Sequence, residues 1–198
     1  MDFVHRASAL PSRLALFPGS FNPLTRAHLA LARAALAHAD ELVFVVPRMF
    51  PHRPYEGASL EQRLEILRNA SEAEPRFSVA ATEGGLFIEI AEECRQVYGA
   101  EIDLLFLCGR DAAERIVNWD YGVAEEFARQ LEVFQLLVAA RYGEYTPPAH
   151  LADRIRALRV PEDYSDISST EVRRRARSGE PWEHLVPPEI VPLVRGML

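Results

Sequence analysis

The stretch FPGSFNPLTRAHLALARAAL, residues 17–36, joins an apolar run to a helical pattern through a tight turn. The run at residues 14–17 ends at a Pro-Gly pair, and Gly19 has no side chain to keep backbone amides away from a ligand. Thr25 and His28 follow three residues apart, so they lie on the same side of the first helical turn. Because amides at a helix start attract phosphate and an imidazole can donate to a phosphoryl oxygen, the stretch predicts a strand, turn and helix that bind an anion.

Apolar, strand-like runs alternate with helical patterns along the whole chain. Strands are expected at residues 14–17, 41–46, 77–80, 103–107 and 133–140. Helices are expected at residues 27–39, 59–73, 87–98, 123–131, 149–158, 169–178 and 188–197. This alternation predicts a Rossmann-like α/β fold, a doubly wound parallel sheet with helices on both faces and a C-terminal helical extension. We expect one domain over residues 1–198, with an N-terminal tail at 1–12 and a C-terminal helical part at 165–198.

Polar and cationic residues follow the ends of the expected strands. Ligands of an open parallel sheet bind beyond the carboxyl ends of its strands, so these residues should gather at one edge. They are Gly19, Ser20, Phe21, Asn22, Thr25 and His28 after the first run, Pro47, Arg48, His52 and Arg53 after the second, Gly109, Arg110 and Asp111 after residue 107, and Arg141 after residue 140. The mixture of arginine, histidine and backbone amides indicates a site for an anionic ligand.

The charge balance and the cysteine content exclude several classes of protein. Of the 198 residues, 29 are acidic and 22 are basic, and the net charge of −7 argues against a duplex nucleic-acid binder. No apolar run approaches the roughly 18 residues that a membrane span requires, and the first residues lack the pattern of a signal peptide. Cys94 and Cys108 have no metal-type spacing, so we expect a reduced, cytoplasmic setting with neither a nucleic-acid nor a membrane partner.

The absence of lysine narrows the chemistry further, because all 22 basic residues are arginine. Schiff-base chemistry and a Walker-type phosphate loop both need lysine, so both are excluded. Any bound phosphate must therefore be held by arginine, histidine, backbone amides or a metal ion. A dinucleotide-binding dehydrogenase is disfavoured as well, since no G-x-G-x-x-G follows the first apolar run.

A second informative stretch, DISSTEVRRRARSGEPWEHLVPPEI at residues 166–190, begins a helix near the C-terminus. Ser168, with Glu171 three residues later, predicts a capping box that is followed by a run of arginines. Taken alone, this pattern is also typical of a capped surface helix with solvated arginines. The amides of a helix start and one bidentate guanidinium can also form a clamp for a polyphosphate.

Together the two stretches resemble the nucleotidylyltransferase superfamily. Its signature is Gly-[Ser/Thr]-Phe-x-Pro followed by His/Thr-x-Gly-His, which reads GSFNPLTRAH at residues 19–28 here. The C-terminal I-S-S-T-x-[IV]-R and the later L-V-P most resemble the branch that makes dinucleotides, the nicotinate/nicotinamide mononucleotide adenylyltransferases. The chain departs from the signature at Ala27, where glycine is usual, and at Asn22, where aspartate is commoner.

The middle of the chain carries three further segments of this resemblance. VPRMFPHR at residues 46–53 resembles V-P-x-x-x-P-H-K, with Arg53 in place of lysine, and leads into a helix of the R-x-x-M-L type. FLCGRDAAERIVNW at residues 106–119 resembles I-x-G-x-D with a later tryptophan. EGGLFIEIAEECR at residues 83–95 is the weakest match, because residues 86–88 are apolar where the family's Gly-x-Ser-Tyr-Thr recognises the nicotinate group.

The resemblance implies transfer of AMP from ATP to a pyridine mononucleotide, with pyrophosphate released. The implied catalytic residues are His28, Thr25 and Arg173. The implied ATP-binding residues are Gly19, Ser20, Phe21, His28, Gly109, Asp111, Arg141, Ser168, Ser169, Thr170 and Arg173. The implied acceptor-binding residues are Arg53, Phe87 and Trp119, the last by stacking on the pyridine ring. Mg²⁺ is expected to be bound mainly through the nucleotide phosphates, and the sequence shows no dedicated metal cage.

Two other functions stay open from the sequence. A related adenylyl- or cytidylyltransferase acting on phosphopantetheine or another phosphorylated acceptor is favoured by Thr25, because FPGSFNPLT resembles the phosphopantetheine enzymes. A nucleotide-binding protein without turnover is favoured by Ala27 and by the apolar residues 86–88. The sequence does not distinguish nicotinate from nicotinamide mononucleotide, and it is compatible with a homo-oligomer.

Overall fold

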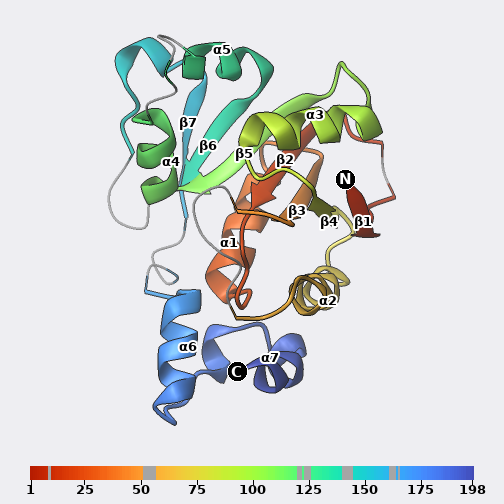
Figure 1. The fold of residues 1–198 in the computed structure, drawn as a ribbon, viewed down its shortest axis with the longest axis vertical. Coiled ribbons are helices and arrows are strands. Elements are labelled where there is room, and N and C mark those ends of the chain that lie inside the picture. Colours follow the sequence, from red (N-terminus) through yellow and green to blue (C-terminus); the bar gives the residue numbers. More distant parts are fainter. Residues whose placement is uncertain are drawn as a thin grey trace.

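The computed structural model describes most of the chain, and Figure 1 shows how its elements are arranged. The described residues are 1–8, 10–50, 57–119, 122, 126–139, 145–160, 164 and 166–198. They form a central sheet with helices on both faces, and the C-terminal helices lie together at one end of the molecule (Figure 1).

The sheet built by the described residues has the strand order β1-β4-β3-β2-β5-β6-β7. The strands are β1 Asp2–His5, β2 Arg13–Pro18, β3 Glu41–Pro47, β4 Phe77–Thr82, β5 Asp103–Gly109, β6 Gln135–Ala139 and β7 Ile155–Leu158. Strands β2 to β7 pair in parallel, and β1 pairs antiparallel with β4 at one edge. Every residue of β3 and β4 is buried, as expected of parallel strands covered on both faces.

The helices cover the two faces of the sheet in two hydrophobic layers. They are α1 Arg26–Ala35, α2 Leu60–Ser71, α3 Phe87–Tyr98, α4 Arg110–Val117, α5 Glu126–Val133, α6 Ser169–Arg177 and α7 Val191–Met197. Ala15 and Phe17 of β2 pack with α1, α2 and the C-terminal helices, whereas Leu14 and Leu16 pack on the other face with α3, α4 and α5. The predicted doubly wound α/β fold is therefore confirmed.

The strand order reverses between β2 and β5. The chain passes from β2 outward to β3 and β4, then returns to β5 and continues outward to β6 and β7. Leu16 pairs with Phe106, and Gly19 and Gly109 each follow three residues later, so the turns after these neighbouring strands lie at the same edge of the sheet. Such a switch point is where open α/β sheets bind their ligands.

The helix expected at residues 149–158 is wrong. The structure has a 3₁₀ turn at Ala149–Leu151, η1, followed by β7, which pairs in parallel with β6. Ile155 and Leu158 are buried and the two residues between them are exposed. A spacing of three fits one face of a helix as well as this short edge strand, so periodicity could not separate the two.

Other differences concern the ends of elements. Residues 1–12, expected as a tail, include the edge strand β1, and α4 was not expected. Val133 ends α5 and does not begin β6, which starts two residues later. The last expected helix begins as the 3₁₀ turn η4, Pro188–Ile190, and continues as α7.

Candidate active site

The turn between β2 and α1 is built around Phe21. This residue has a φ of 41°, which is uncommon for a bulky side chain, and it is 2% exposed. Its ring packs edge-on against Phe17, Phe44 and His28, at centroid distances of 5.3, 5.5 and 5.4 Å. The Phe21 side chain therefore belongs to the hydrophobic core, and its backbone is the part that can face a nucleotide.

Gly19 allows this turn to fold closely over the aromatic cluster. Its N–H donates to Val45 O at 3.0 Å, which continues the pairing of β2 with β3 beyond the end of β2. A Cβ at Gly19 would lie 2.9 Å from the Phe21 ring, closer than side-chain carbons approach in practice. The ring of Phe21 therefore favours glycine at position 19, the second residue of the Pro-Gly pair.

Thr25 and His28 form a capping box at the start of α1. Thr25 is fully buried, and its Oγ1 accepts the His28 N–H at 3.4 Å. The Thr25 N–H donates to His28 Nδ1 at 3.1 Å, and Thr25 Oγ1 lies 2.8 Å from the same nitrogen. Because a backbone N–H can only donate, Nδ1 is an acceptor and the proton of the neutral ring lies on Nε2. The start of α1 therefore fixes both the orientation and the tautomer of His28.

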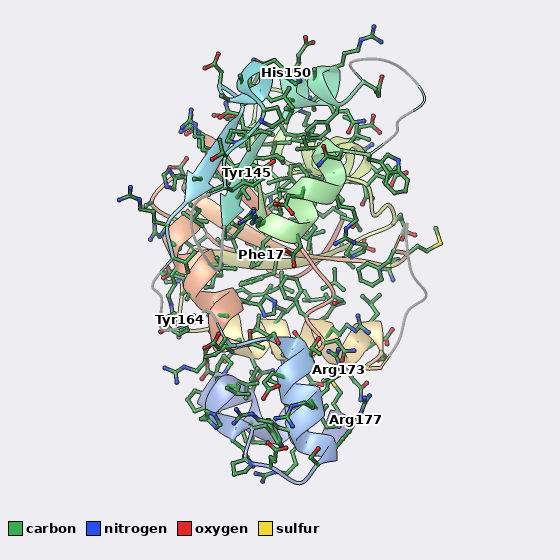
Figure 2. All side chains as sticks on the ribbon, turned by 90° about the vertical axis from the view of Figure 1, so that its left-hand side faces the viewer. Phe17, Tyr145, His150, Tyr164, Arg173 and Arg177 are labelled. Carbon is green, nitrogen blue, oxygen red and sulfur yellow. The ribbon has the colours of Figure 1, made fainter. Side chains whose placement is uncertain are left out.

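The start of α6 contacts the turn after β2 directly. Ser169 Oγ donates to Pro23 O at 2.8 Å, across 146 residues of chain. Arg173 Nη1 donates to Asn22 O, across 151 residues. In Figure 2, Arg173 lies on the part of α6 nearer to the sheet and Arg177 on the part farther away. The fold thus brings together the two stretches that the sequence analysis identified independently.

The first turn of α6 is capped by Ser168, whose Oγ accepts the Glu171 N–H at 3.1 Å. The other half of the predicted capping box is absent, because the Glu171 carboxylate binds Arg174 and Arg175 at 2.7 to 2.9 Å. Hydrogen bonds from Arg174 and then Arg175 lower the pKa of Glu171 to about 2. Thr170 Oγ1 lies 3.4 Å from the guanidinium of Arg173. These contacts order the helix start that carries the proposed phosphate clamp.

The turn from β5 into α4 lies on the other side of the switch point. Gly109 ends β5 and precedes the first residue of α4, and a Cβ there would meet no atom of the described part of the chain within 4 Å. Asp111 is exposed in the first turn of α4. Trp119 follows the end of α4, and its side chain is 50% exposed, so it is not part of the hydrophobic core. An exposed carboxylate therefore follows the carboxyl end of β5, and no described residue fills the space beside Gly109.

Phe87, predicted to contact the acceptor, begins α3 and stacks on Phe106 of β5. The two ring centroids are 4.4 Å apart and the planes differ by 13°, while Phe134 packs edge-on at 6.1 Å from Phe87. One face of the Phe87 ring is thus occupied within the hydrophobic layer. The contact does place the start of α3 against β5, one of the two strands at the switch point.

The loop before α3 donates its backbone amides to two carboxylates of the same chain. Glu89 Oε2 accepts the N–H groups of Gly85 and Leu86, and each distance is 3.0 Å. Glu93 Oε1 accepts those of Glu83 and Gly84, also at 3.0 Å. The family resemblance assigns such amides to recognition of the nicotinate group, whereas here they stabilise the start of α3.

Arg53 and Arg141, predicted for the acceptor and the triphosphate, lie outside the described residues, as does His52. Arg63 of α2 is the arginine of the R-x-x-M-L match, to which the sequence analysis assigned no role. It is 1% exposed and donates through Nη1 to Ser20 O at 3.1 Å. The sequence contains a signal that Arg63 is buried, because this residue lies three residues after Leu60 and four before Leu67. It therefore falls on the apolar stripe of its helix.

Three further features of the described residues bear on function. Within residues 1–8, 10–50, 57–119, 122, 126–139, 145–160, 164 and 166–198, no three His, Cys, Asp or Glu side chains form a group able to hold a metal ion. No helix there has the length and apolar character for crossing a membrane. A cavity of about 780 Å³, lined among others by Arg13, Asp40 and Asp103, lies at the amino ends of β2 and β5, opposite the switch point.

The helix-capping histidine of α1 and the arginine-bearing start of α6 lie beside the same turn of a doubly wound sheet, as the resemblance to the nucleotidylyltransferases implies. Residues 16–175, from β2 into α6, match the family model described as cytidylyltransferase-like. The match contains the whole first stretch and the first ten residues of the second, which include Ser168 and Arg173. The chain belongs to the cytidylyltransferase-like family.

Relatives of this chain carry a more particular name. A protein of Gloeobacter violaceus is 33% identical over 90% of this chain and 91% of its own length. Proteins of Yersinia pestis and Carboxydothermus hydrogenoformans are 32% and 29% identical, over 89% and 90% of this chain and 90% and 93% of their own lengths. Each of the three is named "probable nicotinate-nucleotide adenylyltransferase".

Proposed function

We propose that the protein transfers AMP from ATP to nicotinate mononucleotide or nicotinamide mononucleotide and releases pyrophosphate, a step of NAD biosynthesis. The observation that carries this proposal is the direct contact of the turn after β2 with the start of α6, through Ser169 to Pro23 and Arg173 to Asn22. That contact supports the assignment of the His28 imidazole and of the α6 start with its arginine to one triphosphate site. The names of the relatives supply the pyridine mononucleotide as acceptor.

The chemistry requires alignment and charge neutralisation more than a protein nucleophile. A phosphate oxygen of the acceptor would attack the α-phosphorus of ATP, and the bond from that phosphorus to the oxygen bridging to the β-phosphate would break as pyrophosphate leaves. The acceptor phosphate is already an anion, so it needs no general base. His28 Nε2–H would donate to an α-phosphate oxygen as negative charge builds up, with Thr25 holding the ring in place.

The leaving pyrophosphate would be held by the start of α6. The amides of Ser168, Ser169 and Thr170 begin a helix and so favour negative charge, and Arg173 adds a guanidinium. In the structure Arg173 donates to Asn22 O, so this hydrogen bond would be shared with, or exchanged for, one to a phosphate oxygen. We assign Gly19, Ser20, Phe21, Gly109, Asp111 and Arg141 to the remainder of the ATP site.

The acceptor would bind on the α3 and α4 side of the switch point, near Phe87 and Trp119. Arg53, which lies outside the described residues, remains assigned to the acceptor from the resemblance alone. The exposed Trp119 can stack on a pyridine ring. One face of the Phe87 ring is already stacked on Phe106, so Phe87 would contact the acceptor through the edge of its ring. Glu89 and Glu93 hold the amides of the adjoining loop, so a nicotinate carboxylate would have to compete with them or bind elsewhere.

Mg²⁺ fits this site as an ion carried mainly by phosphate oxygens. Asp111 is the one carboxylate among the proposed site residues, and Mg²⁺ usually takes one or two carboxylates together with substrate phosphates. When bound, the ion would neutralise charge on the triphosphate. We also propose that the chain acts as one domain in the cytoplasm, with small-molecule substrates as its partners and a homo-oligomer compatible with its sequence.

A pyrophosphate-release screen tests the proposal. ATP and CTP are each paired with nicotinate mononucleotide, nicotinamide mononucleotide and phosphopantetheine, and release is expected for ATP with a pyridine mononucleotide. Release with phosphopantetheine or with CTP alone would assign the chain to another branch of the family. ATP binding by calorimetry with no release for any acceptor would identify a nucleotide-binding protein without turnover.

A further inference from the structure

The feature that the proposed function does not use is Arg63, a buried arginine behind the turn after β2. Among the described residues it is the largest of the fully buried side chains, at 1% exposure. Arginine stays charged in proteins, and a buried charge is costly unless it is well hydrogen-bonded. A guanidinium kept in this place on α2 must therefore make contacts that an apolar residue could not.

Two carbonyl groups from separate segments accept hydrogen bonds from Arg63. Its Nε donates to Ala58 O at 2.9 Å, and its Nη1 donates to Ser20 O at 3.1 Å. Ala58 immediately precedes Ser59, the N-cap of α2. The guanidinium thus joins the start of α2 to the turn that carries Gly19 and Phe21.

The hydrogen bond to Ser20 O fixes the plane of the Ser20–Phe21 peptide. This peptide is trans, so the Phe21 N–H points away from the carbonyl oxygen and from Arg63 behind it. A charge-assisted bond to the carbonyl also polarises the peptide, which makes the N–H on the other side a stronger donor. Arg63 therefore sets both the direction and the donor strength of a backbone amide in the turn.

The same peptide determines where the Phe21 ring lies. Phe21 has its φ at 41°, a region that bulky residues occupy only when their surroundings hold them there. Its ring packs at 5.4 Å from the His28 ring, so a rotation of the peptide would move the surface against which the imidazole rests. Loss of Arg63 would thus reach His28 without any direct contact between the two.

We propose that Arg63 is a positioning residue for adenylyl transfer. It holds the Ser20–Phe21 peptide so that the turn amide and the His28 ring meet the α-phosphate of ATP together. This proposal rests on the proposed function for its kinetic readout, and on the geometry of the turn for its structural one. Arg63 would act on the transition state more than on ATP binding, because the start of α6 and the β5 side hold the rest of the nucleotide.

The test compares Arg63→Met and Arg63→Lys with Arg68→Met, a control on the same helix. Arg68 is 45% exposed and pairs with Glu72 at 3.7 Å. We expect Arg63→Met to lower kcat by about 10- to 100-fold with a much smaller change in KM for ATP, because small misplacements of reacting groups are costly. Arg63→Lys should recover part of the loss, since it keeps the charge and a donor. Arg68→Met should match the wild type.

A second readout does not depend on turnover. The backbone amide resonances of residues 19–22 should shift in Arg63→Met and not in Arg68→Met, as measured by NMR of folded protein well below the unfolding temperature. If Arg63→Met does not fold, the kinetic and the NMR measurements are both made on Arg63→Lys, for which we expect a smaller effect. A wild-type protein that releases no pyrophosphate would refute the proposed function, and the resonances would still decide the role of Arg63.

Three results would overturn the proposal. One is a folded Arg63 variant with the kcat of the wild type. Another is an effect confined to KM, which would indicate a role in ground-state binding. The third is a variant of lowered stability whose resonances at residues 19–22 are unmoved, because that combination shows a role in stability alone.

Discussion

His28 serves two purposes with one ring, since its Nδ1 closes the capping box of α1 and its Nε2 carries the proton. Capping boxes are usually closed by Glu or Gln at this third helical position. A His28→Gln variant keeps an acceptor for the Thr25 N–H and loses the imidazole donor. We expect an unchanged thermal midpoint, ATP binding similar to the wild type, and a fall in kcat of about 10²- to 10³-fold, the usual loss for one transition-state donor.

The companion variant His28→Ala separates the two purposes. It should show the same loss of kcat and, in addition, a stability lower by about 1 kcal/mol, because the capping box is broken as well. Thermal unfolding, calorimetric titration with ATP and pyrophosphate release measure the three quantities. Turnover at the wild-type rate in His28→Gln would remove the imidazole from the mechanism.

Gly57 is a second residue whose identity is required by its neighbours. Its φ is 76°, and a Cβ there would overlap the side-chain amide of Asn22 in the turn after β2. We expect Gly57→Ala to lower the free energy of unfolding by about 1–2 kcal/mol through backbone strain, with more from the overlap. Urea denaturation measures this loss.

Gly196 provides the matched control for that substitution. It lies within α7 without a positive φ, and a Cβ there would meet nothing within 4 Å. Gly196→Ala should therefore raise the free energy of unfolding by about 0.5–1 kcal/mol, since glycine is a poor helix former. Equal effects of the two substitutions would show that the strain assigned to residue 57 is absent.

At the scale of elements, α6 depends on the ion pairs of Glu171. Its pKa is about 2 in the folded protein, below the ordinary 4.5, because Arg174 and Arg175 bind the ionised form. The unfolded chain therefore binds the proton more readily. Glu171 stabilises the folded protein above about pH 4.5, and this contribution is lost as the pH falls from about 4.5 toward 2.

The Glu171→Gln variant should reveal this contribution. We expect its urea midpoint to lie below that of the wild type near neutral pH, with a difference that shrinks as the pH falls below about 4.5. High salt should reduce the difference too, because both arginines are partly exposed and their pairs are screened. A difference that stays constant with pH would contradict the assignment of the charge pairs.

How much the sequence predicts differs between elements for physical reasons. β2, β3 and β5 were predicted within two residues because they bury continuous apolar runs. α3 was predicted to its exact bounds, and its buried residues, Ile90, Ala91 and Cys94, have the spacing of one helical face. β7 was missed because its buried residues, Ile155 and Leu158, are spaced like a helix face. α4 was missed because only Ala113 among its residues is buried, which leaves little apolar pattern to detect.

The residues of the candidate site also differ in how far the sequence predicts them. Thr25, His28 and Arg173 were predicted because each stands in a motif whose spacing follows from a helix start. Arg63 stands in the R-x-x-M-L match, but its contact with the turn after β2 could not be predicted, since it depends on a carbonyl 43 residues away that only the folded chain brings near. The internal binding of the loop amides by Glu89 and Glu93 was missed for a similar reason, because backbone donors leave no mark in the sequence.

At the scale of the whole molecule, the C-terminal helices complete the core and do not merely extend it. Val172 of α6 and Val194 of α7 are fully buried in the same hydrophobic cluster as Leu67 of α2 and Ala32 of α1. Figure 1 shows α6 and α7 lying below α1 and α2, at the end of the molecule away from α5. The packing that buries these residues is also what holds the start of α6 against the turn after β2.

This shared core predicts a single cooperative unfolding transition. Trp182, 7% exposed, belongs to the same cluster and lies between α6 and α7. In a Trp119→Phe background it is the one remaining tryptophan of the two in the chain, so its fluorescence reports the C-terminal part alone. Urea unfolding followed by this fluorescence should coincide with unfolding followed by far-UV circular dichroism, which reports all helices. An earlier fluorescence transition would show that residues 165–198 unfold separately, and the triphosphate site would then be assembled from two independently stable parts.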